Sequence, residues 1–464
     1  MNQLARNSRR GFLRTLLTGT VAMPALAGCS LFDDEKKPTL AGHRVPVLSS
    51  RGGLVVSKSN EPQPAITVPA PLKTTDWPMS GRTPSHVGAN YAWSGQLHRR
   101  WTRSIGHGTS EPDFLAFAAL GSNGESVLQA SPVIHQGRIF TMDAAGIVRA
   151  FSWPGMKEEW HFNPKPSRLK SSDLGGGIGA NGDTLYIVDG VSQTVAVETA
   201  TGKVKWRINL DTPGRSAPTI ANGRVFVTTI DGRLFALDAT SGHQLWTYSA
   251  TLAETVMFGL PAVAVVNGIV LAAFGSGDLA ALREESGEVV WSDTLSAGNG
   301  QASALDFSCI RSLPVVQGGT AYAASVAGSF VAIDMRSGRR LWERSIASMN
   351  AILVVDDWLF IITLDEQVAC LDRLTGQVRW ITQLRQYRRV SAKKDGVTWT
   401  GPVLANGKLL CVSTLPDNGL VSLDPRNGQL LALEKMPAPT VVEPIFSDDL
   451  MLIVDNRGDL SAYG

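Results

Sequence analysis

The chain has 464 residues, of which 44% are hydrophobic and 18% charged, so it has ample apolar surface for a large closed core. Its 43 basic and 41 acidic residues nearly cancel. A nucleic-acid-binding protein is expected to carry a basic excess on one face, so the charge balance argues against a nucleic-acid partner.

Residues 1–28 have the pattern of an export leader that is separate from the fold. Arg9 and Arg10, in SRRGFLR, precede an apolar run over residues 16–27 that is too short to span a bilayer as a stable helix. The motif resembles the twin-arginine signal, whose machinery exports folded proteins, and a plain secretory leader is the alternative. The leader ends in LAGC, which resembles the bacterial lipobox. That resemblance implies cleavage before Cys29 and acylation of its sulfur, whereas an ordinary buried thiol is the alternative.

Residues 29–76 are expected to form a flexible tether between the lipid and the folded domain. The stretch from Ser30 to about Thr75 contains DDEKK, six prolines and few aromatic residues. In enterobacterial lipoproteins a residue other than Asp after the acylated Cys accompanies transport to the outer membrane, and Ser30 fits that rule. Removal of the leader would leave 39 basic and 41 acidic residues.

The stretch that ends at Trp246 contains the repeating unit of the chain. Asn222-Gly223 and Asp231-Gly232 are two-residue turns between β-branched and apolar runs, which predicts a meander of short antiparallel strands. An isolated meander cannot bury an indole ring, so Trp246 requires a neighbouring sheet. The pattern therefore predicts a ring or stack of such sheets.

Copies of the unit recur along the chain and predict an all-β, eight-bladed β-propeller over residues 77–464. The eight outer-strand ends are Trp101, Trp160, Trp206, Trp246, Trp291, Trp342, Trp380 and Ala432. The last strand set stops at Gly464 without a fourth strand, and the strand that ends at Trp101 has no sheet before it. Joining these two ends would give four antiparallel strands in each blade and remove the exposed edges of an open array.

The remaining cysteines do not indicate a disulfide scaffold. Cys309, Cys370 and Cys411 are far apart in the sequence and odd in number. Cys370 and Cys411 lie within apolar strands, which favours small buried side chains. A pairing of two of the three is left open.

Motifs for catalysis, cofactors or metals are mostly absent. Residues 177–182, GIGANG, match GxGxxG, but they precede a strand where a dinucleotide site needs a helix, so we interpret them as turn glycines between blades. The seven histidines lack metal-ligand spacing and are expected on the surface or in loops: His43, His86, His98, His107, His135, His161 and His243. An aspartate recurs at one repeat position and is expected to cap the next turn: Asp238, Asp334, Asp372 and Asp424. We therefore expect no catalytic residue, no cofactor and no metal.

The repeat AxDxxTGxxxW resembles the quinoprotein (PQQ-type) propeller repeat. Together with the lipobox it resembles the BamB family, the lipoproteins of the outer-membrane β-barrel assembly machinery. Residues 77–86 resemble the segment that introduces the propeller in alphaproteobacterial members. The resemblance implies a non-enzymatic scaffold that is lipid-anchored to the periplasmic face of the outer membrane. It also implies binding to the periplasmic domains of BamA and delivery of unfolded outer-membrane proteins.

Only part of the family's partner surface can be transferred to this sequence. Arg215 is the best match to the family's contact arginine, and the family's acidic pair in the next contact loop is replaced by CIRSLPV from Cys309, with only Asp306 nearby. A second candidate is the basic stretch LRQYRRVSAKK, which contains Arg385, Arg388, Arg389, Lys393 and Lys394. An idle solvated surface is the alternative for both.

Two other functions remain open at this point. The quinoprotein dehydrogenases, which hold PQQ over a calcium ion, share the repeat, but this chain lacks a vicinal Cys pair and an identifiable ligand set for the metal. A lipoprotein propeller that binds some other periplasmic partner is the third possibility.

Overall fold

The computed structural model describes residues 54–57, 64–109, 128–166, 175–253, 259–295, 308–415 and 417–464. The predicted leader with Arg9 and Arg10, the predicted lipidation site Cys29, and Asp306 lie outside these residues. The regular secondary structure of the described residues consists of strands. A helix that could span a membrane is therefore not found among them.

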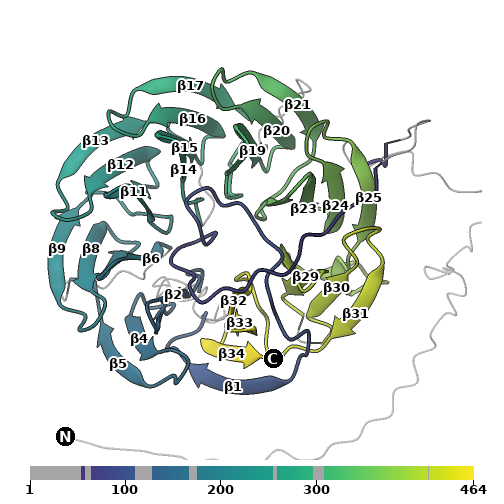
Figure 1. The fold of residues 1–464 in the computed structure, drawn as a ribbon, viewed down its shortest axis with the longest axis horizontal. Coiled ribbons are helices and arrows are strands. Elements are labelled where there is room, and N and C mark those ends of the chain that lie inside the picture. The colour runs from purple at the N-terminus through teal and green to yellow at the C-terminus, as the bar shows by residue number, and fades with distance from the viewer. Residues whose placement is uncertain are drawn as a thin grey trace, which may run out of the picture. The chain divides into compact units, whose positions relative to one another are not determined.

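Eight four-stranded antiparallel sheets surround a common axis as the blades of a propeller, as the sequence predicted (Figure 1). Each blade runs from an inner strand near the axis to an outer strand at the rim. In ring order from the closing blade, the strands of the first four blades are β32 (Ile445–Ser447), β33 (Leu450–Val454), β34 (Asp459–Tyr463) and β1 (Arg99–Ser104); β2 (Val133–His135), β3 (Arg138–Met142), β4 (Val148–Ser152) and β5 (Glu158–Phe162); β6 (Gly177–Asn181), β7 (Thr184–Val188), β8 (Gln193–Glu198) and β9 (Val204–Asn209); and β10 (Thr219–Ala221), β11 (Arg224–Thr228), β12 (Arg233–Asp238) and β13 (Gln244–Ser249).

The other four blades continue the ring in chain order. Their strands are β14 (Ala264–Val266), β15 (Ile269–Ala273), β16 (Asp278–Arg283) and β17 (Val289–Thr294); β18 (Val315–Gln317), β19 (Thr320–Ala324), β20 (Ser329–Asp334) and β21 (Arg340–Ser345); β22 (Leu353–Val355), β23 (Trp358–Ile362), β24 (Gln367–Asp372) and β25 (Val378–Gln383); and β28 (Trp399–Ala405), β29 (Lys408–Ser413), β30 (Leu420–Leu423) and β31 (Leu430–Glu434). A two-stranded hairpin, β26 (Tyr387–Arg389) with β27 (Lys394–Gly396), lies between the last two of these blades in the chain.

The ring closes as predicted, because β1 supplies the outer strand of the blade that ends the chain. β1 pairs antiparallel with β34, and Thr102 lies opposite Ser461 with their hydroxyl oxygens 2.9 Å apart. The two ends of the propeller chain therefore share one sheet, which leaves β34 without a free edge.

The outer-strand tryptophans join neighbouring blades in the way that the repeat predicted. Trp246, 8% exposed, lies over Gly287 in the next blade, where an added Cβ would come 2.7 Å from the indole ring. Its indole N–H donates to the carbonyl of Glu284 at 2.9 Å. Indole N–H groups donate in the same way to the next blade from Trp160, Trp206, Trp291, Trp342 and Trp380. A glycine is needed at each turn because a side chain would displace the ring.

Two of the eight junctions use different contacts. Trp101 packs against Trp153, whose indole N–H donates to Asp448 at 2.6 Å. Where β31 has Ala432 instead of Trp, the closing blade accepts an indole hydrogen bond from Trp93, which donates to the carbonyl of Tyr463 at 3.2 Å. A residue from before the first strand thus donates this hydrogen bond.

The repeated aspartates cap turns, which confirms their structural role. The carboxylate of Asp238 accepts hydrogen bonds from the backbone N–H groups of Thr240 and Ser241. The same pattern recurs at Asp334, Asp372 and Asp424.

Buried positions explain the other sequence motifs. Cys309, Cys370 and Cys411 are buried, and burial raises the pKa of the Cys370 and Cys411 thiols well above their ordinary value. The glycines of residues 177–182 lie mainly in the inner strand β6, rather than in a turn as expected. A glycine is needed at position 179 because the next inner strand comes close: an added Cβ at Gly179 would lie 2.5 Å from Ile220.

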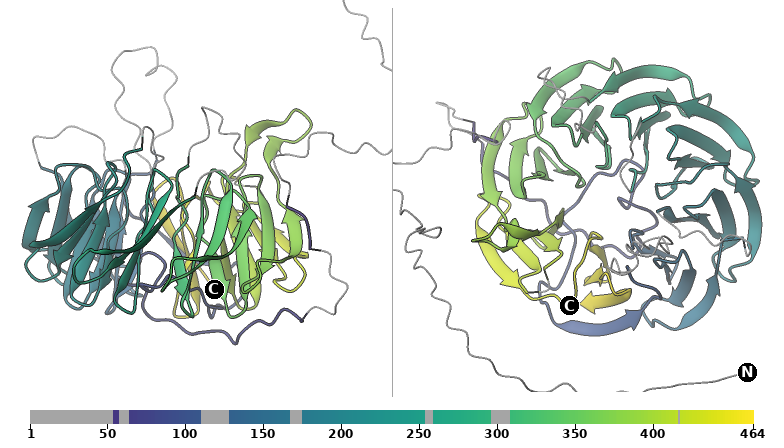
Figure 2. Two further views of the ribbon diagram at one scale, coloured as in Figure 1. Left: turned by 90° about the horizontal axis from the view of Figure 1, so that it is seen from above. Right: turned by 180° about the vertical axis from the view of Figure 1, so that it is seen from behind.

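Residues 74–92, here called the lead-in, run around the axis on one face of the ring (Figures 1 and 2). They contact the inner strand of each blade in ring order, from β32 through β2, β6, β10, β14, β18 and β22 to β28. Backbone hydrogen bonds join Trp77 to Ile134, Pro78 to Ala180, Pro84 to Val265, Ser85 to Val316 and Tyr91 to Leu404. Met79 packs in one cluster with Ile220, and Gly88 lies against Leu353.

The sequence placed residues 29–76 in a flexible tether, but its described parts pack against the propeller. Ile66 is 8% exposed in a core cluster with residues of β23 and β28. At the rim, Ser57 and Val378 of β25 exchange hydrogen bonds of 3.0 and 3.1 Å. The physical reason is that the polar stretch contains single apolar residues and free backbone groups that β25 and the core can bind.

Candidate functional site

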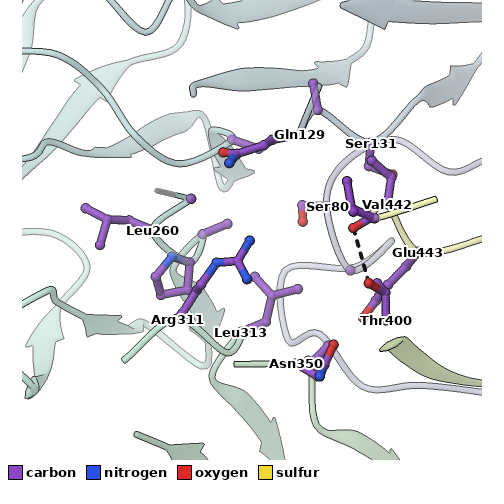
Figure 3. Close-up of a pocket in the computed structure, with 18 of the residues that line it drawn as sticks. Ser80, Gln129, Ser131, Leu260, Arg311, Leu313, Asn350, Thr400, Val442 and Glu443 are labelled. Atoms are coloured by element: carbon purple, nitrogen blue, oxygen red, sulfur yellow. Dashed lines mark hydrogen bonds between the residues drawn. The ribbon is translucent and has the colours of Figure 1, made fainter. Parts of the chain in front are cut away.

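A cavity of about 200 Å³ lies on the propeller axis. The lead-in closes one side with Trp77, Ser80 and Gly81, and the loops that enter the inner strands form the walls. Figure 3 shows Arg311 and Gln129 on one side of the opening and Thr400 and Glu443 on the other. The cavity is thus a polar chamber with groups from most of the blades.

Arg215 and Arg311 occupy the same position in two blades that are separated by one other. Each lies four residues before the first residue of its inner strand, β10 or β18, and both line the cavity. The sequence placed Arg215 on an exposed loop, but it is only 9% exposed because its loop folds inward between blades. Burial lowers the pKa of both guanidinium groups from their ordinary value.

Among the described residues that line the cavity, Glu443 is the one carboxylate. Burial raises its pKa to about 7, although the backbone N–H of Ala351 favours the charged form. The side chain is therefore close to its midpoint at neutral pH, and a change of one pH unit alters the charge of the cavity.

His86 was expected at the surface, but it is buried within the lead-in, 5% exposed. Burial lowers its pKa to about 4, so the ring is neutral at pH 7 and its Nδ1–H donates to the carbonyl of Pro314 at 2.8 Å. The ring fastens the lead-in to the loop that carries Arg311.

Glu443→Gln should increase stability at pH 8 and leave it unchanged near pH 4.5. The pKa of Glu443 is raised in the fold, which means that ionising this carboxyl is harder in the folded than in the unfolded protein. The stability of the protein is therefore complete below the unfolded pKa of this carboxyl and is partly lost as pH rises towards 7. The gain at pH 8 is at most about 3 kcal/mol. Urea unfolding at both pH values measures it, with Glu434→Gln, an exposed carboxylate on β31, as the control. Equal shifts for the two variants would contradict the burial of Glu443.

The basic stretch forms the hairpin β26–β27, which protrudes from the face opposite the lead-in (Figure 2). Three of its arginines are engaged locally. Arg389 pairs with Asp395 at 2.7 Å, Arg388 donates to the carbonyl of Thr414, and Arg385 donates to the carbonyl of Tyr387. Lys393 and Lys394 are exposed near the tip.

The donor groups of the described residues do not fit a quinoprotein metal site. That chemistry needs several carboxylate or amide oxygens around one ion. Within the described ranges no group of three or more His, Cys, Asp or Glu side chains could hold a metal, and the cavity contains one carboxylate.

A family model described as outer membrane protein assembly factor BamB matches residues 144–382, which is more than half of the chain. The chain belongs to the BamB family. It is similar to the BamB of Yersinia pestis, with 24% identity over 97% of this chain and 98% of the relative. It is also similar to the BamB of Escherichia coli K12, with 24% identity over 96% and 97%.

Solved structures support the fold. The crystal structure of BamB from Moraxella catarrhalis matches with a TM-score of 0.64, 18% sequence identity, and coverage of 79% of this chain and 99% of that chain. A europium-containing methanol dehydrogenase matches with a TM-score of 0.63 and 11% identity over 82% of this chain and 89% of that chain. At these identities the likeness shows the propeller alone, so the dehydrogenase match carries no function.

The sequence did not predict the cavity as a site in this BamB-family chain. It singled out Arg215 but not Arg311, Gln129 or Glu443, which belong to different blades. The sequence contained one signal for the site. Arg215 and Arg311 are cationic, whereas the residues at the same position in neighbouring blades, such as Leu260 and Met349, are apolar.

Proposed function

We propose that this protein is a non-enzymatic scaffold of the machinery that assembles β-barrel proteins in the outer membrane. The match of the BamB model to residues 144–382 carries the proposal. Relatives named outer membrane protein assembly factor BamB, which align over nearly their whole length, support it. Among the described residues the cavity offers one carboxylate, fewer oxygen ligands than a quinoprotein calcium site needs, and this supports the non-enzymatic part.

The proposed location is the periplasmic face of the outer membrane. Arg9 and Arg10 would direct export, and acylation of Cys29 would hold the propeller to the membrane. Several acyl chains give durable attachment where a single chain would not. Residues 1–28 would be absent from the mature protein.

The proposed partners are the periplasmic domains of BamA and the unfolded outer-membrane proteins delivered to them. The protruding hairpin supports a contact at Arg385, Arg388, Arg389, Lys393 and Lys394, because clustered positive charge accelerates association with an acidic surface. Arg215 remains a proposed partner residue only for a group that enters the cavity, since its side chain is nearly buried.

Capture of the tagged, full-length protein from detergent-solubilised outer membranes tests the function. Recovery of BamA and other assembly subunits as the main co-purifying proteins is the expected result. Recovery of the protein without any of these subunits, under conditions that keep the assembly complex intact, would contradict the proposal.

Reversing two hairpin charges tests the partner surface. Lys393→Glu with Lys394→Glu should slow association with purified BamA periplasmic domains about tenfold at low salt, and the difference should shrink as salt screens the charges. Surface plasmon resonance measures both rates. The matched control reverses Arg336 and Arg339, which are exposed in the turn between β20 and β21. An equal effect from the control pair would show that net charge, and not the hairpin, governs association.

A further inference from the structure

The hydrogen bonds between the lead-in and the inner strands skip β10. In the blade before it, the penultimate residue of the inner strand, Ala180, donates its backbone N–H to the carbonyl of Pro78 at 2.7 Å. In the blade after it, Val265 donates in the same way to the carbonyl of Pro84 at 2.8 Å. Ile220 holds the equivalent position in β10, but its N–H has no acceptor among the described residues.

The pairing of β10 with β11 shows that the N–H of Ile220 points away from its own sheet. The turn between these strands closes on the pair Ala221 and Arg224, so Ile220 and Val225 form the next pair. Neighbouring pairs in an antiparallel hairpin alternate between those that exchange backbone hydrogen bonds and those whose N–H groups point outwards. The N–H of Ile220 therefore lies on the inner edge of β10, where the lead-in would otherwise bind it.

A detour of the lead-in leaves this edge open. Between Met79 and Pro84 the chain turns back on itself, and the N–H of Arg82 donates to the carbonyl of Met79 at 3.0 Å. The detour leaves a hollow of about 630 Å³, within the roughly 300–1,000 Å³ of pockets that bind ligands. This space, here called the lead-in hollow, is lined by residues that include Asp76, Pro78, Pro84, His135 and Ile220.

Two hydrogen-bond acceptors lie side by side in the lead-in hollow. The Nε2–H of His135 donates to the carbonyl of Gly182 at 3.0 Å, so the neutral ring offers Nδ1 as an acceptor. This Nδ1 is buried and has no hydrogen-bond partner among the described residues. It lies 3.9 Å from one carboxylate oxygen of Asp76, and the other oxygen accepts from the backbone N–H of Gln136 at 3.3 Å.

The charge of the lead-in hollow favours a cationic donor. The side chain of Asp76 is 48% exposed, and the described residues that line the hollow include no lysine or arginine. A buried acceptor without a partner is costly, and a donor from a ligand would satisfy it. A positively charged N–H group would bind both acceptors at once, because its hydrogen bond to a carboxylate is charge-assisted.

We infer that the lead-in hollow binds a short extended peptide segment that contains an arginine or a lysine. A backbone carbonyl of the peptide accepts from the N–H of Ile220, and the basic side chain donates to Asp76 and to Nδ1 of His135. The lead-in shows the same backbone arrangement on both sides of the hollow, where the carbonyls of Pro78 and Pro84 accept from β6 and β14. Binding at this site is independent of the proposed role in outer-membrane assembly.

Fluorescence polarisation with the purified full-length protein tests the inference. The probe is the labelled, amidated peptide Thr-Val-Arg-Val-Thr, and we expect saturable binding with a dissociation constant below about 1 mM. Replacing its arginine by glutamine should weaken binding about fivefold, as expected for a partly exposed ion pair. Asp76→Asn should weaken binding of the arginine peptide to the same extent and leave binding of the glutamine peptide unchanged.

Asp357→Asn is the matched control for the protein. Asp357 is an exposed aspartate in the turn between β22 and β23, outside the lead-in hollow, and this variant should bind both peptides as the unaltered protein does. Thermal melts verify that both variants keep the fold. An equal loss of affinity in Asp357→Asn and Asp76→Asn would overturn the assignment of the basic side chain to Asp76.

Amide hydrogen exchange tests the backbone contact separately. Saturating arginine peptide should slow exchange at the N–H of Ile220 by about tenfold or more, because the peptide carbonyl binds it. Exchange at Ala180 and Val265, whose N–H groups are already bonded to the lead-in, should change little. Unchanged exchange at Ile220, or absence of saturable peptide binding, would overturn the inference. Competition by spermidine, a cation without a peptide backbone, at equal or lower concentration than the unlabelled peptide would overturn the assignment to peptides.

Discussion

Trp246→Ala should destabilise the propeller by about 3–5 kcal/mol, as expected for truncation of a large buried aromatic side chain. The indole ring is 8% exposed, lies 5.9 Å from the ring of Phe226 and covers Gly287 of the next blade. Its removal would open a cavity at the junction of two blades and leave the carbonyl of Glu284 without its indole donor. Urea unfolding followed by circular dichroism measures the loss.

Two further variants separate packing from hydrogen bonding at this junction. Trp246→Phe keeps most of the buried aromatic surface but loses the indole N–H. It should therefore reduce the free energy of unfolding by about 1–2 kcal/mol. Leu245→Ala, at the neighbouring residue of β13, which is 47% exposed, should cost less than about 1 kcal/mol. A Trp246→Ala loss as small as that of Leu245→Ala would refute the view that tryptophans hold adjacent blades together.

The fold was predictable because its determinants repeat. The Trp, the turn glycine and the capping aspartate recur at a fixed spacing. One irregular copy therefore does not change the number of blades that the pattern predicts. Even the ring closure followed from counting, since the strand that ends at Trp101 lacked a sheet and the last blade lacked a strand. Periodic sequence patterns report contacts between neighbouring copies, and a propeller consists mainly of such contacts.

The lead-in and the cavity could not be predicted, because their determinants do not repeat. The lead-in is extended and has no period, and its hydrogen bonds join Trp77 to Ile134 and Tyr91 to Leu404, which are distant in sequence. The cavity is built from single residues that differ between blades. Arg215 was noticed as a loop residue, but only the radial arrangement of the blades shows that it faces the axis together with Arg311.

Tyr91→Ala should cost about 3–5 kcal/mol, although Tyr91 precedes the first strand of the propeller. The side chain is 3% exposed, stacks on Phe446 with ring centroids 5.5 Å apart and packs against Trp77 at 4.9 Å. Its ring thus contacts both the start of the lead-in and the blade that closes the ring. Denaturant unfolding by intrinsic fluorescence and by circular dichroism provides two independent readouts.

Unfolding of this variant should remain a single transition with coincident curves from both probes. The lead-in contacts all eight inner strands, so its release and the opening of the ring should be coupled. Tyr387→Ala, in the hairpin outside the ring, is the matched control and should change stability by less than about 1 kcal/mol. If the lead-in were only a passive tether, Tyr91→Ala would be as mild as this control, and a separate early transition would show that it detaches before the blades unfold.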